Sequence, residues 1–499
     1  MTGPGLPLKE GGSRDCRCKP VKVKLILPAL TEATSPHWRP IKYSLFPPLG
    51  LSTLAAYLDP DDEVEIVDEH VEPPRANPTD PPDLVAIEVY VTSAYRAYAI
   101  ADEYRRRGSH VALGGIHVTS LPDEAARHAD TVFLGPGEDT WPAFLDDFRA
   151  KRPGLIYRST ARTLVGAPWP RRDLIRRSRY LVPNSIVVSR GCPHNCRFCY
   201  KDAFYGGAGQ PAYRSHYTRA VDDALAEVDT LPGRHLYFLD DHLFGSARFA
   251  RGLFSGLSGM GRVWQAGATV ESVLRPGLLE AAAASGLRSL FVGFETLSAR
   301  NLADQGKRQN LGRDYALAVR RLHDLGVMVN ASFVFGLDDD DESVFDRTVG
   351  WAIEQGIETA TFHILTPYPG TALHSELSSA GRVTSSDWDR YDTRHVVYQP
   401  ARLTPEALEA GYWRAYRDFY AWGSILSSAR VRATWRETLR HVAYVGAWKR
   451  AEPVWDLVIR ARALGLMLPL LEGVLGNLSA PGRRSSRESP ALVPADPAR

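Results

Sequence analysis

The sequence predicts an α/β protein with two parallel sheets and a helical C-terminal region, and two observations predict it. Short segments rich in Val, Ile and Leu alternate with helical segments over residues 21–149, and again from residue 184 to about 380. A Pro- and Arg-rich stretch without clear periodicity, residues 150–183, separates the two series. Five strands in the first series are typical of a doubly wound sheet. Six βα units in the second are typical of a partial, open (β/α)6 barrel of TIM type.

Composition predicts several domains and no strongly charged surface. A single core seldom exceeds about 250–300 residues, so 499 residues predict two or three domains. With a net charge of +2 and no basic stripe, we do not expect a nucleic-acid partner. We find no run of about 18 apolar residues that would span a membrane. The first twenty residues lack the apolar core of a signal peptide. We therefore expect a cytoplasmic protein whose cysteines stay reduced.

The first series of βα units begins at Val21. Pro47 and Pro48 open its first helix, because proline suits the first turn of a helix. The expected strands are Val21–Leu27, Val64–Val67, Leu84–Val91, His110–Leu113 and Thr131–Leu134, and the expected helices are 49–58, Tyr95–Arg107, Leu121–His128 and Trp141–Arg149. Sheets of this kind bind ligands at the carboxyl ends of their strands.

Glycine-rich loops follow two neighbouring strands of this sheet. Gly114 and Gly115 end the fourth strand, and Gly135 and Glu138 lie in the loop after the fifth. The third strand is followed by a loop that ends at Tyr95. Glycine lets backbone approach a bulky, nucleotide-like ligand, but it also makes tight βα turns. Two such loops side by side leave both interpretations open.

The second series of βα units predicts the barrel. Its expected strands are Ser185–Ser189, His235–Leu239, Val263–Val270, Arg288–Phe294, Val327–Phe335 and Thr359–Leu365, and its expected helices lie near 216–230, 246–257, 276–285, 311–325, 341–355 and 371–380. Six units are fewer than the eight of a closed barrel. The open side could admit a large substrate or the neighbouring domain.

The composition changes after Leu403. Thr404 is an expected N-cap, Pro405 takes the first helical position, and Glu406 lies in the first turn. Six aromatic residues then crowd one expected helix: Tyr412, Trp413, Tyr416, Phe419, Tyr420 and Trp422. Packing explains such a stripe better than a binding site does. The predicted organisation is a disordered tail (1–20), the sheet domain (21–149), a linker (150–183), the barrel (184–400), a helical region (401–478) and a second disordered tail (479–499).

The chemistry of the chain is concentrated in one loop after the first barrel strand. Cys192, Cys196 and Cys199 form a C-x3-C-x2-C array followed by Tyr200. A structural zinc site needs four ligands, usually from two C-x2-C pairs, and no second pair occurs. His194 would have to fold back within the same loop to be a fourth ligand. Three thiolates suit an iron–sulfur cluster with one iron left open for chemistry.

The remaining cysteines, Cys16 and Cys18, lie in the polar N-terminal tail. A solvated tail explains this C-x-C pair better than an auxiliary pair of metal ligands does.

Residues 184–375 resemble the radical SAM superfamily. The resemblance rests on the C-x3-C-x2-C spacing, on the aromatic residue that follows it, and on the position of this loop after the first strand of the βα series. The resemblance implies a 4Fe-4S cluster held by the three cysteines. It also implies that S-adenosylmethionine (SAM) binds the open iron and is cleaved to a 5′-deoxyadenosyl radical. An external electron donor such as flavodoxin or ferredoxin is implied as well.

Residues after the later barrel strands resemble SAM-binding segments of the same superfamily. Tyr200 follows the cysteines, and Asp240 or Asp241, which the sequence does not separate, could accept from the methionyl ammonium. Glu295 resembles the glutamate of a G-x-E-S/T segment, and Gly336 resembles a segment that borders adenine. The segment 366–371, TPYPGT, resembles a further motif of the cobalamin-type members.

Residues 21–149 resemble the cobalamin-binding domain fused to many of these enzymes. The resemblance rests on PPLGL (47–51), GGIHVT (114–119) and GPGED (135–139). It implies cobalamin contacts at Tyr95, Gly114, Gly115, His117, Gly135 and Glu138. The D-x-H-x-x-G motif that supplies a histidine to cobalt is absent. Asp68 and His70 come near it, but they follow the second strand, and a proline replaces the glycine.

Together these resemblances imply a cobalamin-dependent radical SAM enzyme that methylates an unactivated carbon of a small molecule. An alternative is a cyclase or rearrangement enzyme of the same group. RNA methylthiolation is disfavoured, because residues 21–149 contain no cysteine for a second cluster. A cluster-bearing or cobalamin-bearing sensor is also disfavoured, because a sensor does not require acids at successive strand ends. The substrate cannot be inferred from the sequence.

Overall fold

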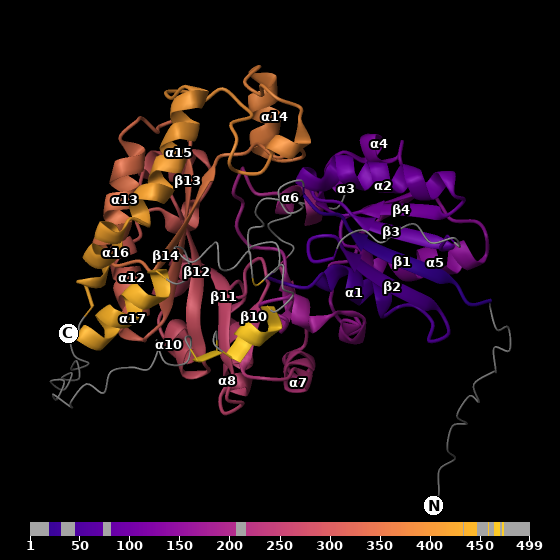
Figure 1. The fold of residues 1–499 in the computed structure, drawn as a ribbon, viewed down its shortest axis with the longest axis horizontal. Helices are drawn as coiled ribbons and strands as arrows, with labels where there is room; N and C mark the ends of the chain where they lie inside the picture. Colours follow the sequence, from indigo (N-terminus) through magenta and orange to yellow (C-terminus); the bar gives the residue numbers. More distant parts are fainter. Residues whose placement is uncertain are drawn as a thin grey trace, which may run out of the picture.

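In a computed structural model, the protein forms two parallel sheets that lie side by side (Figure 1). The structure describes residues 19–30, 45–72, 81–205, 216–432 and 434–446, together with 458, 464–469 and 472–473. Cys16, Cys18, the tail predicted at 479–499 and most of residues 447–478 of the predicted helical region lie outside these residues. Among the described helices, none has the length and apolar character of a membrane-spanning segment.

The N-terminal sheet has six parallel strands in the order β2-β1-β3-β4-β5-β6. Its strands are β1 (Lys22–Leu27), β2 (Glu63–Asp68), β3 (Leu84–Glu88), β4 (His110–Gly114), β5 (Thr131–Leu134) and β6 (Ile156–Arg158). The helices α1 (Leu49–Ala55) and α5 (Trp141–Arg149) cover one face. The helices α2 (Ala94–Arg106), α3 (Ile116–Ser120) and α4 (Pro122–Ala125) cover the other. The predicted doubly wound sheet is confirmed.

Three details of this sheet differ from the sequence prediction. The strand β6 lies in the stretch predicted as a linker and pairs with β5, so the sheet has six strands instead of five. The third strand ends at Glu88, and a 3₁₀ turn (Val91–Ser93) follows. The helix expected at Leu121–His128 is the short helix α4, which begins at Pro122 and ends at Ala125, and a further short helix that was not expected, α3, precedes it.

The second sheet is the predicted open barrel. Six parallel strands follow the order β14-β13-β12-β11-β10-β7, so β14 and β7 are its two edges. They are β7 (Ser185–Ile186), β10 (His235–Phe238), β11 (Val263–Thr269), β12 (Leu287–Glu295), β13 (Met328–Phe335) and β14 (Thr359–Ile364). The helices are α7 (Val221–Thr230), α8 (Ala247–Leu257), α9 (Val270–Leu274), α10 (Leu278–Ala284), α11 (Ala299–Asp304), α12 (Tyr315–Asp324), α13 (Val344–Glu354) and α14 (Ala372–Ser379).

The first barrel strand differs from its predicted form. The expected strand Ser185–Ser189 is split into β7 and β8 (Ser189–Arg190). The strand β8 leaves the sheet and pairs antiparallel with β9 (Tyr217–Thr218), which lies where a helix was expected. This two-residue ribbon closes the base of the loop that carries the cysteines, and the short helix α6 (Lys201–Tyr205) follows them.

The C-terminal helices pack beside β14 and α13 (Figure 1). They are α15 (Pro405–Phe419), α16 (Trp422–Ala429) and α17 (Trp435–Val445). The Thr404 side chain accepts from the Ala407 amide, which confirms the predicted cap. Trp422 starts α16, so the six aromatic residues do not share one helix. Tyr416 and Tyr420 bond the backbone of β14, and Tyr412 and Phe419 are buried in the barrel core, which supports the packing interpretation of the stripe.

Candidate functional site

The cysteine loop lies at the carboxyl end of the first barrel strand, where barrel enzymes place their active sites. Cys192, Cys196 and Cys199 are free thiols. Burial raises the pKa of Cys192 to about 11 and that of Cys199 to about 12, so these thiols stay protonated without a metal. Metal ligation requires the thiolate, so metal binding must release these protons. Three cysteines on one short loop fit a cluster with an open iron. His194 lies against His242, with ring centroids 5.3 Å apart.

Asp241 holds this loop from the neighbouring strand. One carboxylate oxygen accepts from the Gly191 amide at 2.9 Å and from the Tyr205 hydroxyl at 2.7 Å. The other oxygen accepts from the Tyr200 hydroxyl at 2.8 Å. The carboxylate therefore joins the residue before the first cysteine to two tyrosines that follow the last one. Tyr200 and Asp241 are thus part of the hydrogen bonding that holds the loop, and their predicted contacts with SAM stay predictions.

Asp240 has a comparable position one residue earlier. Its Oδ1 atom accepts from the Val188 amide at 3.0 Å and the Ser189 hydroxyl at 2.6 Å, and also from the Ser189 amide. This bonding fixes the point where the chain leaves β7 for β8. Its Oδ2 atom is buried and has no partner among the described residues. Burial raises the Asp240 pKa to about 7 despite these hydrogen bonds. Its predicted SAM contact stays a prediction.

Glu295 lies at the end of β12 and forms a buried ion pair with Lys307. Its backbone is left-handed, with φ 66°. Burial lowers the Lys307 pKa, but the charges of Glu295 and Cys196 outweigh this effect and leave it raised. A Cβ at Gly293 would lie 2.5 Å from the Glu295 carboxylate, so a side chain there would displace the ion pair. The Gln309 side chain, two residues beyond Lys307, donates to Cys196 Sγ at 3.5 Å. Glu295 is thus linked to the cysteine loop, and SAM binding by it stays a prediction.

Gly336 has φ 93° at the end of β13. A Cβ there would overlap the Tyr398 hydroxyl and Leu408, so close packing explains why this residue is glycine. The Asp340 carboxylate caps this turn by accepting from the Gly336 and Leu337 amides, both at 3.0 Å. The predicted contact of Gly336 with adenine is untested.

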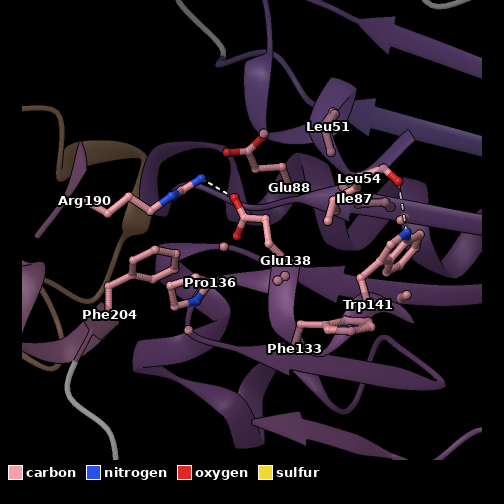
Figure 2. A pocket seen from close by; sticks show the side chains of 17 residues that line it. Leu51, Leu54, Ile87, Glu88, Phe133, Pro136, Glu138, Trp141, Arg190 and Phe204 are labelled. Carbon is pink, nitrogen blue, oxygen red and sulfur yellow. Dashed lines mark hydrogen bonds and ion pairs between the residues drawn. The ribbon is translucent and has the colours of Figure 1, made fainter. Parts of the chain in front are cut away.

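A cavity of about 110 Å³ opens at the carboxyl edge of the N-terminal sheet (Figure 2). Four of the residues predicted to contact cobalamin line it: Gly114, Gly115, Gly135 and Glu138. Its apolar walls come from Leu51, Leu54, Ile87, Phe133 and Trp141. Two glycines are required by their backbones, since φ is 108° at Gly115 and 84° at Gly135. A Cβ at Gly115 would also lie 2.9 Å from the Val89 carbonyl oxygen. In such a glycine-lined apolar slot the backbone can approach a flat ring of a nucleotide-like cofactor closely.

Two predicted cobalamin contacts lie away from this cavity. His117 is buried, with Nε2 3.2 Å from Glu124 and its ring against Trp388. Tyr95 donates to the Ser386 carbonyl oxygen at 3.2 Å. Neither is among the residues that line the cavity. His70 is also absent from it, and its Nδ1 lies 2.9 Å from Asp68, consistent with a chance match to the histidine motif.

Sequence reasoning missed the polar lining residues Glu88 and Arg190 and the barrel residue Phe204, as well as the apolar walls of the cavity. Glu88 lines it beside Glu138, and burial raises the Glu88 pKa. Arg190 and Phe204 belong to the barrel domain but reach into the cavity (Figure 2). Arg190 forms an ion pair with Glu138 across the two domains. The position of Arg190 two residues before the first cysteine was the only sequence signal, and it does not reveal the partner.

Replacing Asp241 by asparagine is expected to lower iron retention by about 10-fold or more, the range for residues that orient metal ligands. Both oxygens of the Asp241 carboxylate accept hydrogen bonds, so the NH2 group of an asparagine would face at least one donor where an acceptor is needed. The loop would also lose the negative charge of its acceptor. Iron per chain after anaerobic reconstitution and gel filtration measures the effect. Asp338→Asn, at a surface pair with Arg382, is the matched control. Wild-type iron retention in Asp241→Asn would refute the positioning role.

Asp340 predicts a specific pH dependence of folding. Burial raises its pKa from the usual 3.8 to about 7, so the folded protein holds a proton that the unfolded chain releases. Its contribution to stability is complete below about pH 4 and is lost as pH rises through about 7. As the pH rises from about 4 to about 7, the free energy of unfolding of the wild type should therefore fall, relative to that of Asp340→Asn, by more than about 1.4 kcal/mol. Denaturant titrations at several pH values measure it, and a constant difference would contradict the shift.

The N-terminal sheet domain and the barrel each match a known protein family. A B12 binding domain matches residues 43–145, and the Radical SAM superfamily matches residues 186–352. Bacteriochlorophyllide d C-12(1)-methyltransferase of Chlorobaculum tepidum is 30% identical over 69% of this chain and 76% of its own length. Hopanoid C-2 methylase of Rhodopseudomonas palustris is 27% identical over 69% of this chain and 66% of its own length.

Solved structures share the fold over most of the chain. The radical S-adenosylmethionine methyltransferase TsrM of Kitasatospora setae, with cobalamin and a 4Fe-4S cluster bound, has a TM-score of 0.59. It is 14% identical, and the match covers 89% of this chain and 99% of that one. The cobalamin-dependent radical enzyme OxsB has a TM-score of 0.60 at 13% identity, over 92% of this chain and 79% of that one.

Proposed function

Since the chain belongs to the radical SAM superfamily and carries a B12-binding domain, we propose that it is a cobalamin-dependent methyltransferase acting on an unactivated carbon of a small molecule. Its cofactors are a 4Fe-4S cluster, SAM and cobalamin. The observation that carries the proposal is the shared wall between the glycine-lined cavity and the cysteine loop. A carbon without a nucleophilic lone pair needs both a radical generator and a methyl carrier close together.

The chain's own residues provide binding and positioning. Bound cobalamin supplies a methyl carrier, and the bound cluster supplies the electron that cleaves SAM. We assign cluster ligation to Cys192, Cys196 and Cys199, and positioning of their loop to Asp241. We assign the cobalamin tail to the cavity between Leu54 and Trp141, within a cofactor domain over 21–149, and the cluster to the barrel over 184–400.

The electron donor and location belong to the same proposal. Cluster reduction requires a one-electron donor, and a flavodoxin or ferredoxin has suitable chemistry. Free, closely spaced thiols on the cysteine loop are consistent with a reducing compartment such as the cytoplasm.

The test uses the full chain, reconstituted anaerobically with iron and sulfide and supplied with SAM, hydroxocobalamin and a strong reductant. Bacteriochlorophyllide d and a hopanoid, named in two relatives, are the first substrates to offer. We expect methylated product together with 5′-deoxyadenosine. Two relatives are magnesium-protoporphyrin IX monomethyl ester cyclases, 24% identical to this chain. 5′-Deoxyadenosine with an unmethylated, altered product would therefore refute methyl transfer and favour cyclisation or rearrangement.

A further inference from the structure

Both flanks of the cysteine loop are walls of the cavity in the other domain. Arg190 lies two residues before Cys192, and Phe204 lies five residues after Cys199. Both side chains line the cavity together with Gly135 and Glu138 (Figure 2). A ligand that fills the cavity therefore contacts both ends of the segment that carries the metal ligands.

Arg190 connects the two sites most directly. Its backbone belongs to β8, where it pairs with Tyr217 and fixes the base of the loop. Its guanidinium reaches across the domain boundary to Glu138 in the 3₁₀ turn Gly137–Asp139, and both side chains are largely buried. Its Nε atom is buried and has no partner among the described residues. The residue that fixes the base of the cysteine loop is therefore also part of the cavity wall.

The other end of the loop contacts the segment after β6 and the glycine loop of the cavity. The Arg162 side chain donates to the Tyr205 carbonyl oxygen at 2.7 Å. A Cβ at Gly135 would lie 3.2 Å from the Phe204 carbonyl oxygen, so the glycine loop of the cavity touches the helix α6 directly. Neither end of the loop can move without disturbing the cavity wall.

We infer that Arg190 is a positioning residue shared by the two cofactor sites, and that its pair with Glu138 couples their occupancy. Cobalamin in the cavity restricts Arg190 and Phe204, so the loop loses less conformational freedom when it binds the cluster. Coupling between two sites is reciprocal, so the cluster must tighten cobalamin binding by the same factor. The inference rests on the proposed function, because it requires both cofactors to bind this chain.

The test measures the dissociation constant of hydroxocobalamin by equilibrium dialysis, for the full chain with and without its reconstituted cluster. We expect binding to the cluster-loaded wild type to be about five-fold tighter or more, the lower end of typical couplings. The ratio of the dissociation constants without and with the cluster should fall below about two-fold in Arg190→Gln and in Glu138→Gln. Arg190→Lys keeps the charge and should retain part of the wild-type ratio. A ferrous-iron chelator gives a second measure, since hydroxocobalamin should slow iron loss only where the ion pair is intact.

Arg432→Lys is the matched control, because Arg432 forms a buried pair with Glu358 outside the cavity. It should keep the wild-type ratio, and thermal melting checks that each variant is folded. The same affinity with and without cluster in the wild type would overturn the inference, as would a full ratio in Arg190→Gln and Glu138→Gln. Failure of the wild type to bind hydroxocobalamin in either form would instead refute the proposed function itself.

Discussion

Cys192→Ala is expected to lower 5′-deoxyadenosine formation below about one hundredth of the wild-type rate, since even residues that only orient metal ligands contribute 10- to 100-fold. With three thiolates on the loop and no fourth, removing one leaves two ligands for the cluster. Most of the cavity lining lies in the other domain, so hydroxocobalamin should still bind, with the weaker affinity expected of the chain without its cluster. Anaerobic assay of 5′-deoxyadenosine from SAM measures the first effect, and equilibrium dialysis measures the second.

Its control is the double variant Cys16→Ala/Cys18→Ala, which removes the two cysteines of the N-terminal tail. This variant should cleave SAM at the wild-type rate. Unaltered SAM cleavage by Cys192→Ala would refute the cluster assignment. Loss of cleavage in the double variant would instead make the tail part of the metal site.

Leu54→Trp is expected to weaken cobalamin binding by about 10- to 100-fold, the equivalent of the 1–3 kcal/mol that overpacking typically costs. Leu54 lines the cavity, and its side chain would lie 3.5 Å from a Cβ at Gly137 on the facing loop. The hydrogen bond that the Trp141 indole Nε1 donates to the Leu54 carbonyl oxygen does not depend on the Leu54 side chain. An indole can therefore occupy the cavity while α1 keeps its place.

SAM cleavage separates this effect from unfolding. Leu54→Trp should still form 5′-deoxyadenosine, because the cysteine loop is intact, but it should give little methylated product. Leu54→Ala, which enlarges the same space, should bind hydroxocobalamin with an affinity closer to that of the wild type. Wild-type affinity in Leu54→Trp would show that the cofactor does not use this cavity.

The regular elements of both sheets were predictable from the sequence because their signals are local. Each barrel strand after the first was predicted to within about two residues at either end, since buried parallel strands are continuous apolar runs. Elements of two or three residues were missed. The strands β6, β8 and β9 are too short for any periodicity, and only their partners make them strands.

In the candidate site, the metal-binding loop was predictable from the sequence, and the cavity was not. The cysteine spacing is local, and it identifies the metal loop without a structure. The pairing of Arg190 with Glu138 joins residues 52 positions apart in different domains, so no local pattern reports it. Leu54, Phe133 and Trp141 have the sequence signature of core residues, and only the fold shows that they border a cavity. The sequence did not separate Asp240 from Asp241, and the hydrogen bonds of Asp241 to both ends of the cysteine loop come from residues 36 to 50 positions away, which no local pattern reports.

The central claim is that one chain holds a cluster and cobalamin in adjoining sites. Its most direct test is the iron, sulfide and cobalamin content of the anaerobically reconstituted full chain after gel filtration. We expect about four iron and four sulfide ions together with one cobalamin per chain. Zinc in place of iron, or a chain that retains the cluster but no cobalamin, would contradict the account.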